Sequence, residues 1–469
     1  MTTLEKLTAK RRAYVDAARD NGFEEGLRKL LADLYPDNAH FIYELLQNAE
    51  DAGAREVSFE LQLDGLRFEH DGRRAFDLRD IESITGIGQS TKADDATSIG
   101  KFGVGFKAVF AYTQTPHVQS GEHSFAILDL FVPTPAPHTP RPGNVTTFWF
   151  PFDRAGKSPE RAVAEIGRAL HDVSRSTLLF LNSIRLIVCT FPDGDERLLE
   201  RRDTDEHIVE IDSVHETSGP SYWYRITGDV QIGEKQFPVA AAFALKSTAE
   251  QVEKQDATAV EVKRTRGEYE VEPIEGNVFI YFPAIKETSG LKFHVHAPFA
   301  STVARDSVRE DEGNEQLIEG LARMVADAMP TMREAGLVTE GLLSALPNRS
   351  DELPERYLPL RRHIVKAFEL YPLTPKQGGG FAESTKLIRS ISAVRASMTP
   401  ADVDVLREIS MEVGDEVATG WLGDRDGRPR EFVASLRAIN FGSAEIAAIF
   451  ERIGEIKTNI KDWGDEAEE

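Results

Sequence analysis

The sequence predicts an α+β protein that folds into more than one region. Apolar residues recur at helical spacing in some segments and alternate with polar residues in others. The length of 469 residues also exceeds what one ordinary core accommodates. We expect an α/β region at 1–155 that opens with helices, a second α/β region at 156–330, and a mostly helical region at 331–469.

Composition indicates a globular cytoplasmic protein. Hydrophobic residues make up 41% of the chain, and 55 Lys and Arg face 78 Asp and Glu, for a net charge of −23. This balance disfavours broad non-specific binding to nucleic acid, although a local basic groove stays compatible with it. The single cysteine, Cys189, indicates a reducing compartment. The N-terminus is too charged for a signal peptide and no apolar run is long enough to span a bilayer, so we expect no membrane association.

The segment 42–54 carries the first candidate site. Its apolar residues predict a short helix that packs on one side and stops at Gly53. Glu44, Asn48 and Asp51 recur at i, i+4 and i+7 along another side. A carboxylate and an amide oxygen one turn apart suit a divalent cation with bound water, or a base that acts on such a water. The alternative is the solvated side of an amphipathic helix.

The next segments predict a β-hairpin. Residues 57–61 and 66–70 alternate apolar and polar side chains around a short turn. The hairpin ends in His70-Asp71-Gly72, where the glycine lets the backbone come close to a ligand. Asp71 is better explained by local chemistry as a turn residue.

A short helical pattern at 80–84 leads into the first of two glycine-rich segments. It contains Ser90, Thr91 and Lys92, followed by an acidic run. Two glycines, two hydroxyls and a lysine predict a loop that closes over an anion.

The second glycine-rich segment is the sharpest signal in the chain. Gly100, Gly103 and Gly105 precede a predicted helix start at Phe106. Backbone N–H groups then converge where a phosphate is favoured. The segment differs from a Walker A loop because no Gly-Lys-Ser/Thr closes it, and it lacks the preceding strand of a dinucleotide fingerprint.

Further strands are predicted at 124–132 and 145–150, separated by a proline-rich loop at 133–142. Thr146 or Thr147 places a hydroxyl toward the candidate site, although β-propensity alone explains both residues.

The second region is predicted to contain a helix at 161–174, a helix at 314–329 and several strands between them. His294 and His296 alternate on one strand, and structural roles are favoured over metal binding because no matching Cys or acid spacing accompanies them. The strands are expected near 184–189, 222–226, 237–244, 278–282 and 292–296. Beyond 347, helices at 357–369 and 400–413 alternate with loops, and we find no repeat or catalytic cluster.

Three motifs in this order resemble those of the GHKL ATPases, which include heat-shock chaperones, type II topoisomerases, histidine kinases, MutL-type repair proteins and sacsin. They are Glu44-Leu-Leu-Gln-Asn48-Ala-Glu-Asp51-Ala, His70-Asp71-Gly72 and Gly100-Lys-Phe-Gly103-Val-Gly105-Phe-Lys107. Within this superfamily, the closest likeness is to sacsin and its bacterial relatives. The segments Ile84–Lys92, Thr177–Arg185, Gly276–Pro283 and His296–Phe299 also resemble theirs.

The resemblance implies a Bergerat α/β sandwich that binds ATP in 1–155, a transducer-like domain in 156–330 and a helical region in 331–469. It implies that Glu44 orients or deprotonates the attacking water, that Asn48 holds Mg²⁺, and that Asp51 supports the adenine side or the base. It places a basic side chain on the γ-phosphate, for which Lys246 and Arg305 are the candidates. The remaining nucleotide contacts fall to His70, Asp71, Gly72, Ser90, Thr91, Lys92, Gly100, Lys101, Phe102, Gly103, Val104, Gly105, Phe106 and Thr147.

One position departs from the family pattern. The family commonly has Asp two residues before Gly72, where it accepts from the adenine amino group, and this chain has His70 there. Either Asp71 takes the role through a shifted turn, or base recognition uses water and backbone. The preference among nucleotides is therefore left open.

The resemblance implies a magnesium-dependent ATPase whose lid closes and whose second domain rearranges, for chaperone-like remodelling or for a bacterial antiviral defence switch. A protein client or partner, or a nucleotide-dependent dimer, is expected. One alternative is a nucleotide-gated binding module with little hydrolysis, against which the intact Glu44 argues. Another is a DNA-remodelling ATPase like the MutL or topoisomerase branches, against which the net charge argues.

Overall fold

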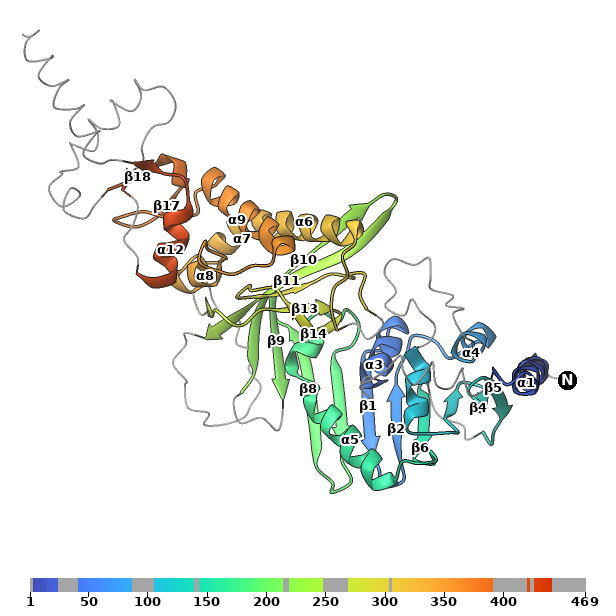
Figure 1. The fold of residues 1–469 in the computed structure, drawn as a ribbon. Coiled ribbons are helices and arrows are strands. Elements are labelled where there is room, and N and C mark those ends of the chain that lie inside the picture. The colour runs from blue at the N-terminus through green and yellow to red at the C-terminus, as the bar shows by residue number, and fades with distance from the viewer. Residues whose placement is uncertain are drawn as a thin grey trace, which may run out of the picture. The chain divides into compact units, whose positions relative to one another are not determined.

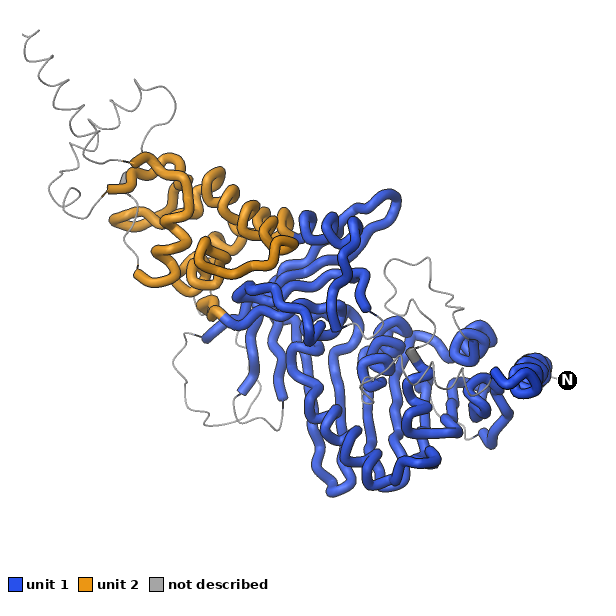
Figure 2. The backbone as a smooth tube through the Cα atoms, viewed as in Figure 1, with its two compact units in different colours: residues 1–247, 274–321 blue, residues 248–273, 322–469 orange. Residues whose placement is uncertain are grey.

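The computed structural model describes residues 3–23, 41–86, 105–138, 143–213, 219–247, 269–302, 306–390, 420–421 and 426–440. By its internal contacts the chain divides into unit 1, formed by 1–247 and 274–321, and unit 2, formed by 248–273 and 322–469 (Figure 2). The predicted α+β class is confirmed, with a large mixed sheet and several helices (Figure 1). The division at 155 and 330 stays a prediction.

One mixed sheet runs through unit 1. The parallel pair β1–β7 connects the hairpin part of the sheet to the strands of the second α/β region. In spatial order the strands are β14 (Phe282–Thr288), β13 (Asn277–Ile280), β15 (His294–His296), β11 (Lys235–Ser247), β10 (Ser221–Ile232), β9 (Ile208–Ser213), β8 (Glu196–Asp203), β7 (Leu186–Thr190), β1 (Glu56–Leu61), β2 (Gly65–His70), β6 (Thr146–Pro151), β3 (His117–Ser120), β4 (His123–Leu128) and β5 (Val132–Pro135).

The predicted hairpin is confirmed by the antiparallel pairing of β1 and β2. Leu61 lies opposite Leu66 and Val57 opposite His70, so the buried side chains of both strands share one face of the sheet. The turn needs Gly65 because a Cβ at this position would lie 2.3 Å from the Trp149 ring.

Helices cover this buried face (Figure 1). The ring of Phe41 in α3 lies 6.3 Å from that of Phe150 in β6, and Gly167 of α5 lies against Leu61 of β1. Apolar side chains from both layers form one continuous core. The helices of unit 1 are α1 (Thr3–Asp20), α3 (Phe41–Asp51), α4 (Leu78–Ile84), the 3₁₀ helix η2 (Gly105–Ala111), α5 (Pro159–Asp172) and the 3₁₀ helix η3 (Arg175–Leu178), while α6 (Glu312–Asp327) begins in unit 1 and continues into unit 2.

The single strand predicted at 124–132 is wrong. The structure ends β4 at Leu128, and Asp129 and Leu130, with φ of 48° and 70°, turn the chain into β5. An ion pair of 2.8 Å between Arg12 in α1 and Asp129 holds this turn. The apolar run continues through the turn, so the sequence pattern does not reveal it.

Unit 2 combines helices with short strands. The helix predicted at 357–369 is confirmed as α9, and its Phe368 ring lies 5.0 Å from that of Phe432 in α12. The helix predicted at 400–413 lies outside the described residues. The elements are β12 (Tyr269–Val271), α7 (Met329–Glu334), α8 (Glu340–Ala345), η4 (Glu355–Tyr357), α9 (Leu358–Leu370), β16 (Thr374–Pro375), β17 (Phe381–Ala382), η5 (Ser384–Lys386), β18 (Leu387–Arg389), β19 (Gly420–Trp421), α12 (Gly427–Ser435) and β20 (Ile439–Asn440).

None of the helices in the described part of the chain combines the length and the apolar composition that a membrane crossing requires.

Candidate functional site

Helix α3 forms the base of the candidate site. Its Leu46 and Ala49 are fully buried on the side that the sequence predicts to pack. The helix ends at Asp51, and Gly53 just after it has a φ of 67°. The N–H of Gly53 donates to the Glu50 carbonyl and the N–H of Ala54 to the Ala49 carbonyl, at 2.9 and 3.0 Å. These two bonds form a Schellman cap and confirm the predicted stop.

Glu44, Asn48 and Asp51 follow one another along α3 at successive turns. The Glu44 side chain is largely withdrawn from water, since the residue is only 7% exposed. Asn48 and Asp51 are half-buried. This burial argues against the freely solvated helix side that was the alternative interpretation.

The turn after β2 is tied to the end of α3. The N–H of Arg73 donates to the Ala52 carbonyl at 2.9 Å. A Cβ on Gly72 would lie 3.2 Å from the His70 ring and 3.3 Å from the Ala52 side chain, closer than neighbours normally allow. The glycine thus permits the close approach of the 70–72 turn to the C-terminal end of α3, the helix that carries Glu44, Asn48 and Asp51.

Asp71 acts as a turn residue, as local chemistry predicts. Its Oδ1 accepts from the backbone N–H groups of Arg55 and Glu56 at 2.7 and 2.8 Å. One carboxylate oxygen therefore holds the turn against the start of β1.

His70 belongs to a row of polar side chains that crosses three strands on the buried face. Strand register places His70 of β2 opposite Thr146 of β6, and Thr146 opposite Ser120 of β3. All three residues are buried, and the hydroxyls of Thr146 and Ser120 share a hydrogen bond of 2.6 Å. We call these residues the His70 row. Burial lowers the pKa of His70 to about 4, so its imidazole is neutral at pH 7.

The geometry favours Thr146 over Thr147 as the hydroxyl that faces the candidate site. Thr147 pairs with Glu69 across the strands, and its hydroxyl donates to Glu69 Oε1 at 3.1 Å. Because side chains alternate along a strand, Thr147 lies on the face opposite to Thr146 and His70.

Most of the glycine-rich segments fall outside the described residues, including Ser90, Thr91, Lys92, Gly100, Lys101, Phe102, Gly103 and Val104. The described residues resume at Gly105, where η2 begins, so the helix start predicted at Phe106 takes the form of a 3₁₀ helix. The Phe106 ring is buried, 5.8 Å from the Phe148 ring of β6.

Lys107 is buried, and the sequence does not predict its burial or its hydrogen-bond partners. Its ammonium group donates to the carbonyls of Ile84 and Leu130 at 2.8 and 2.6 Å. Burial, assisted by the nearby charge of Arg11, lowers its pKa to about 7. Lys107 thereby links the end of α4 to the turn between β4 and β5.

Glu50 connects α3 to the second α/β region. Its Oε1 accepts from the N–H groups of Asn182 and Ser183 at 2.7 and 2.8 Å, and its Oε2 accepts from Ile184 at 2.9 Å. Burial raises the pKa of this carboxyl, although the three backbone bonds oppose the rise. The sequence contains a signal for this buried role, because Glu50 is an acid on the side of α3 that packs.

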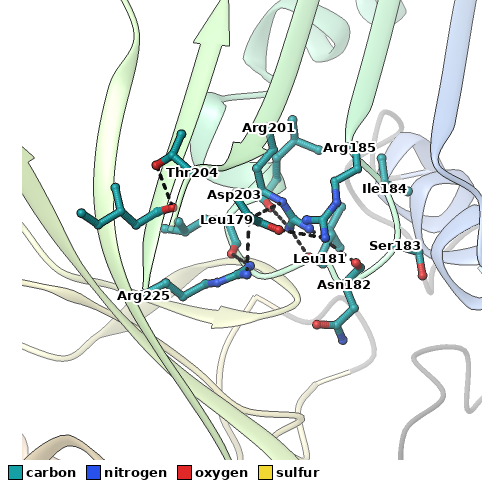
Figure 3. A network of polar contacts seen from close by, with 12 residues as sticks. Leu179, Leu181, Asn182, Ser183, Ile184, Arg185, Arg201, Asp203, Thr204 and Arg225 are labelled. Carbon is teal, nitrogen blue, oxygen red and sulfur yellow. Dashed lines mark hydrogen bonds and ion pairs between the residues drawn. The ribbon is translucent and has the colours of Figure 1, made fainter. Parts of the chain in front are cut away.

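The opposite side of the same loop is held by arginines (Figure 3). The side chain of Arg201 has no exposed surface and donates to the carbonyls of Leu178 and Leu181. Arg185, Arg201 and Arg225 all form ion pairs with Asp203, at 2.9, 3.6 and 3.5 Å. We call the loop 178–184, together with Glu50, Asp203 and the three arginines, the 178–184 joint.

A second connection lies at the other end of α3. The ring of Tyr43 lies 4.9 Å from that of Phe282 in β14. The preceding residue, Tyr281, has a φ of 67°, which is strained for an aromatic residue, and its N–H donates to Nδ1 of His296 at 3.2 Å. Glu44 and Asn48 therefore lie between two contacts of α3 with the second region.

The roles of the predicted basic side chains stay predictions. Lys246 is exposed near the end of β11, and Arg305 lies outside the described residues. In the described ranges, no three or more His, Cys, Asp or Glu residues gather as a metal site. Nδ1 of His294 accepts from the N–H of Asn277, and Nδ1 of His296 accepts from the N–H of Tyr281. These bonds within the sheet are in line with the predicted structural roles of both histidines.

Comparisons with known proteins support a relationship to sacsin-like proteins. Residues 70–138 match a family model described as the Sacsin domain. Protein NO VEIN of Arabidopsis thaliana is 28% identical over 354 residues, which are 67% of this chain and 12% of NO VEIN. Sacsin of Homo sapiens is 35% identical over 104 residues, which are 19% of this chain and 2% of sacsin. The chain therefore spans only a small part of either relative.

Among solved structures, the N-terminal domain of a DNA repair protein is similar with a TM-score of 0.33 and 10% identity, over 58% of this chain and 86% of that one. A likeness this weak carries no argument about fold or function.

Proposed function

We propose that the chain binds and hydrolyses ATP with Mg²⁺ as a GHKL-type ATPase, whose Bergerat α/β sandwich lies in 1–155. The observation that supports it best is the junction of α3 with the 70–72 turn. The bond from Arg73 to Ala52 and the close approach at Gly72 hold the turn that follows His70 against the C-terminal end of α3, the helix that carries the buried Glu44 and the half-buried Asn48. These residue types are those that nucleotide hydrolysis requires.

The residues present fit such a ligand. Gly72 lets the turn pack closely on His70 and Ala52, and His70 and Thr146 provide polar groups on the buried face. Bound Mg²⁺, held by the Asn48 amide oxygen, would offset phosphate charge. Glu44 would orient a water and accept its proton, since its carboxylate is partly withdrawn from competing solvent. Backbone N–H groups of 100–105 would bind the phosphates.

Two contacts of α3 support conformational switching as the outcome of the cycle. A shift of α3 would act on the 178–184 joint through Glu50 and on β14 through Tyr43. Both contacts join α3 to the second α/β region, which would rearrange when a lid over the nucleotide closes. Chaperone-like remodelling of a protein client, or a defence switch that acts through a partner or a dimer, are the roles that this coupling would serve.

Phosphate release from magnesium-ATP tests the proposal. We expect Glu44→Gln to lower turnover by more than about a hundredfold while calorimetry shows retained ATP binding, because a positioned base contributes on this scale. The matched control is Glu60→Gln in β1, which lies on the opposite face of the sheet and should keep wild-type turnover. An active Glu44→Gln variant would remove Glu44 from this role. Tight binding without turnover in the wild type would instead indicate a nucleotide-gated module.

A further inference from the structure

Gln47 of α3 is a buried polar residue to which the proposed function gives no role. The residue is only 1% exposed, and its Nε2 is buried. Among the described residues, none forms a hydrogen bond with this nitrogen. Leaving a buried amide donor without a partner destabilises a fold, so an unpaired group at such a position calls for an explanation.

Helical spacing places Gln47 beside the candidate base. Glu44 precedes Gln47 by three residues, so the two side chains are neighbours along one side of α3. Side chains of a helix lean toward its N-terminus, so Gln47 reaches back over the turn that carries Glu44. Glu44 is itself only 7% exposed. The unpaired amide and the carboxylate therefore belong to one part of the molecule that is withdrawn from water.

Gln47 also lies on the side of α3 that faces the second α/β region. Tyr43, four residues before it, contacts Phe282 of β14. Glu50, three residues after it, binds the backbone of 182–184. Residues at these spacings share a side of a helix, so Gln47 lies between the two contacts. Packing thus holds the amide in place while its Nε2–H groups stay unused, which is the property of a preorganised donor.

Packing alone does not account for a glutamine at this position. The neighbouring buried positions of α3 carry Leu46 and Ala49. A methionine at position 47 would fill about the same volume without burying an unpaired donor. The amide therefore points to an acceptor that the fold does not supply.

We propose that Gln47 donates a side-chain N–H to an oxygen of the γ-phosphate of bound ATP, next to the water that Glu44 orients. This inference rests on the proposed function. In hydrolysis the water oxygen bonds to the γ-phosphorus, the bond to the β-phosphate oxygen breaks, and a proton of the water passes to Glu44, which gives ADP and phosphate. A fixed donor in a site withdrawn from water stabilises charge on the γ-phosphate oxygens during this transfer. Gln47 therefore serves turnover and not the binding of the rest of the nucleotide.

Gln47→Met tests the assignment, because methionine keeps the length of the side chain and removes the donor. We expect turnover of magnesium-ATP to fall by about a hundredfold, since one preorganised donor contributes on this scale. The affinity for magnesium-ADP, measured by calorimetry, should change by less than about twofold, because ADP lacks the γ-phosphate. The urea midpoint of unfolding should be unchanged or higher, because methionine buries no unpaired donor.

The matched control is Gln114→Met. It removes an exposed amide whose Nε2 already donates to the Asp153 carbonyl at 2.8 Å, and it should keep wild-type turnover.

Wild-type turnover in Gln47→Met would overturn the role of Gln47. A lower urea midpoint would do the same, because it would show that the amide is paired in the fold. Equal losses of turnover and of ADP affinity would show a general distortion of the site and would also overturn the role. Failure of the wild type to bind either ATP or ADP would instead overturn the proposed function, and the role of Gln47 with it.

Discussion

The 178–184 joint and the His70 row both bury polar groups, but they satisfy them differently. In the joint, Glu50 accepts from three consecutive backbone N–H groups, and Arg201 donates to carbonyls of the same loop. In the row, His70 uses one ring nitrogen on Gly72 and has no partner for the other among the described residues. The joint holds its charged groups through many bonds, although Arg201 Nε and Arg185 Nη1 have no hydrogen-bond partner in the described part of the chain. The row holds the His70 ring through one bond.

The difference in bonding indicates what each region does in the molecule. Many bonds to one loop fix one geometry, because any movement of the loop would break several of them at once. The joint therefore fixes the loop 178–184 against α3, and the His70 row is the region to which the proposed function assigns ligand recognition.

The largest expected effect comes from the joint. Arg201→Met removes the guanidinium and leaves carbonyls of 178–184 and the Asp203 carboxylate without their partner. We expect a loss of about 3 kcal/mol in the free energy of unfolding, measured by urea denaturation, as for other buried charge pairs that are broken.

The neighbouring arginine is the matched control. The side chain of Arg202 is 52% exposed and pairs with Glu200 and Glu210 at the surface. Arg202→Met should change the free energy of unfolding by less than about 0.5 kcal/mol. Equal effects of the two variants would show that the buried bonds of Arg201 do not stabilise the joint.

Acid pH should weaken both regions, with a smaller effect per pH unit than loss of Arg201. Burial lowers the pKa of His70 and of His296, whose ring stacks on Phe180 of the joint, to about 4 from the ordinary 6.5. Between these values the unfolded chain binds more protons than the folded chain, so stability is lost as the pH falls from 6.5 to 4. Each histidine contributes at most about 1.4 kcal/mol per pH unit.

Denaturation at several pH values checks this expectation. His70→Phe and His296→Phe should each flatten the dependence of stability on pH in this window, since each removes one titrating group. A slope that stays the same in both variants would show that other groups carry the acid sensitivity.

The sequence predicts the parts of this chain in which the pattern is local. The capped helix α3, the hairpin β1–β2 and the turn role of Asp71 follow from spacing and turn chemistry, and the structure has them. The strand β8 has no comparable pattern, because Arg201 occupies a buried position where alternation predicts an apolar residue. Only the fold brings Glu50 and Arg201 to the same loop from distant segments.

The candidate site shows the same limit. The acids of α3 are evident from the sequence, whereas the choice between Thr146 and Thr147 depends on which face of β6 is buried. Both residues are threonines in a β-rich segment, so their identity carries no information about the face. Register with His70 and Ser120 decides it.

The smallest expected effect comes from substitutions of Thr146 and Thr147. Thr146→Val removes the hydroxyl next to His70, and we expect it to weaken ATP binding by about fivefold, on the scale of one hydrogen bond near 1 kcal/mol. Thr147→Val removes the hydroxyl bound to Glu69 on the other face and should change affinity by less than about twofold. Both substitutions keep a β-branched side chain of similar size, so a difference between them reports on the hydroxyl and not on the fold. A larger effect from Thr147→Val would place the ligand on the opposite face of β6 and would break the assignment of the His70 row to recognition.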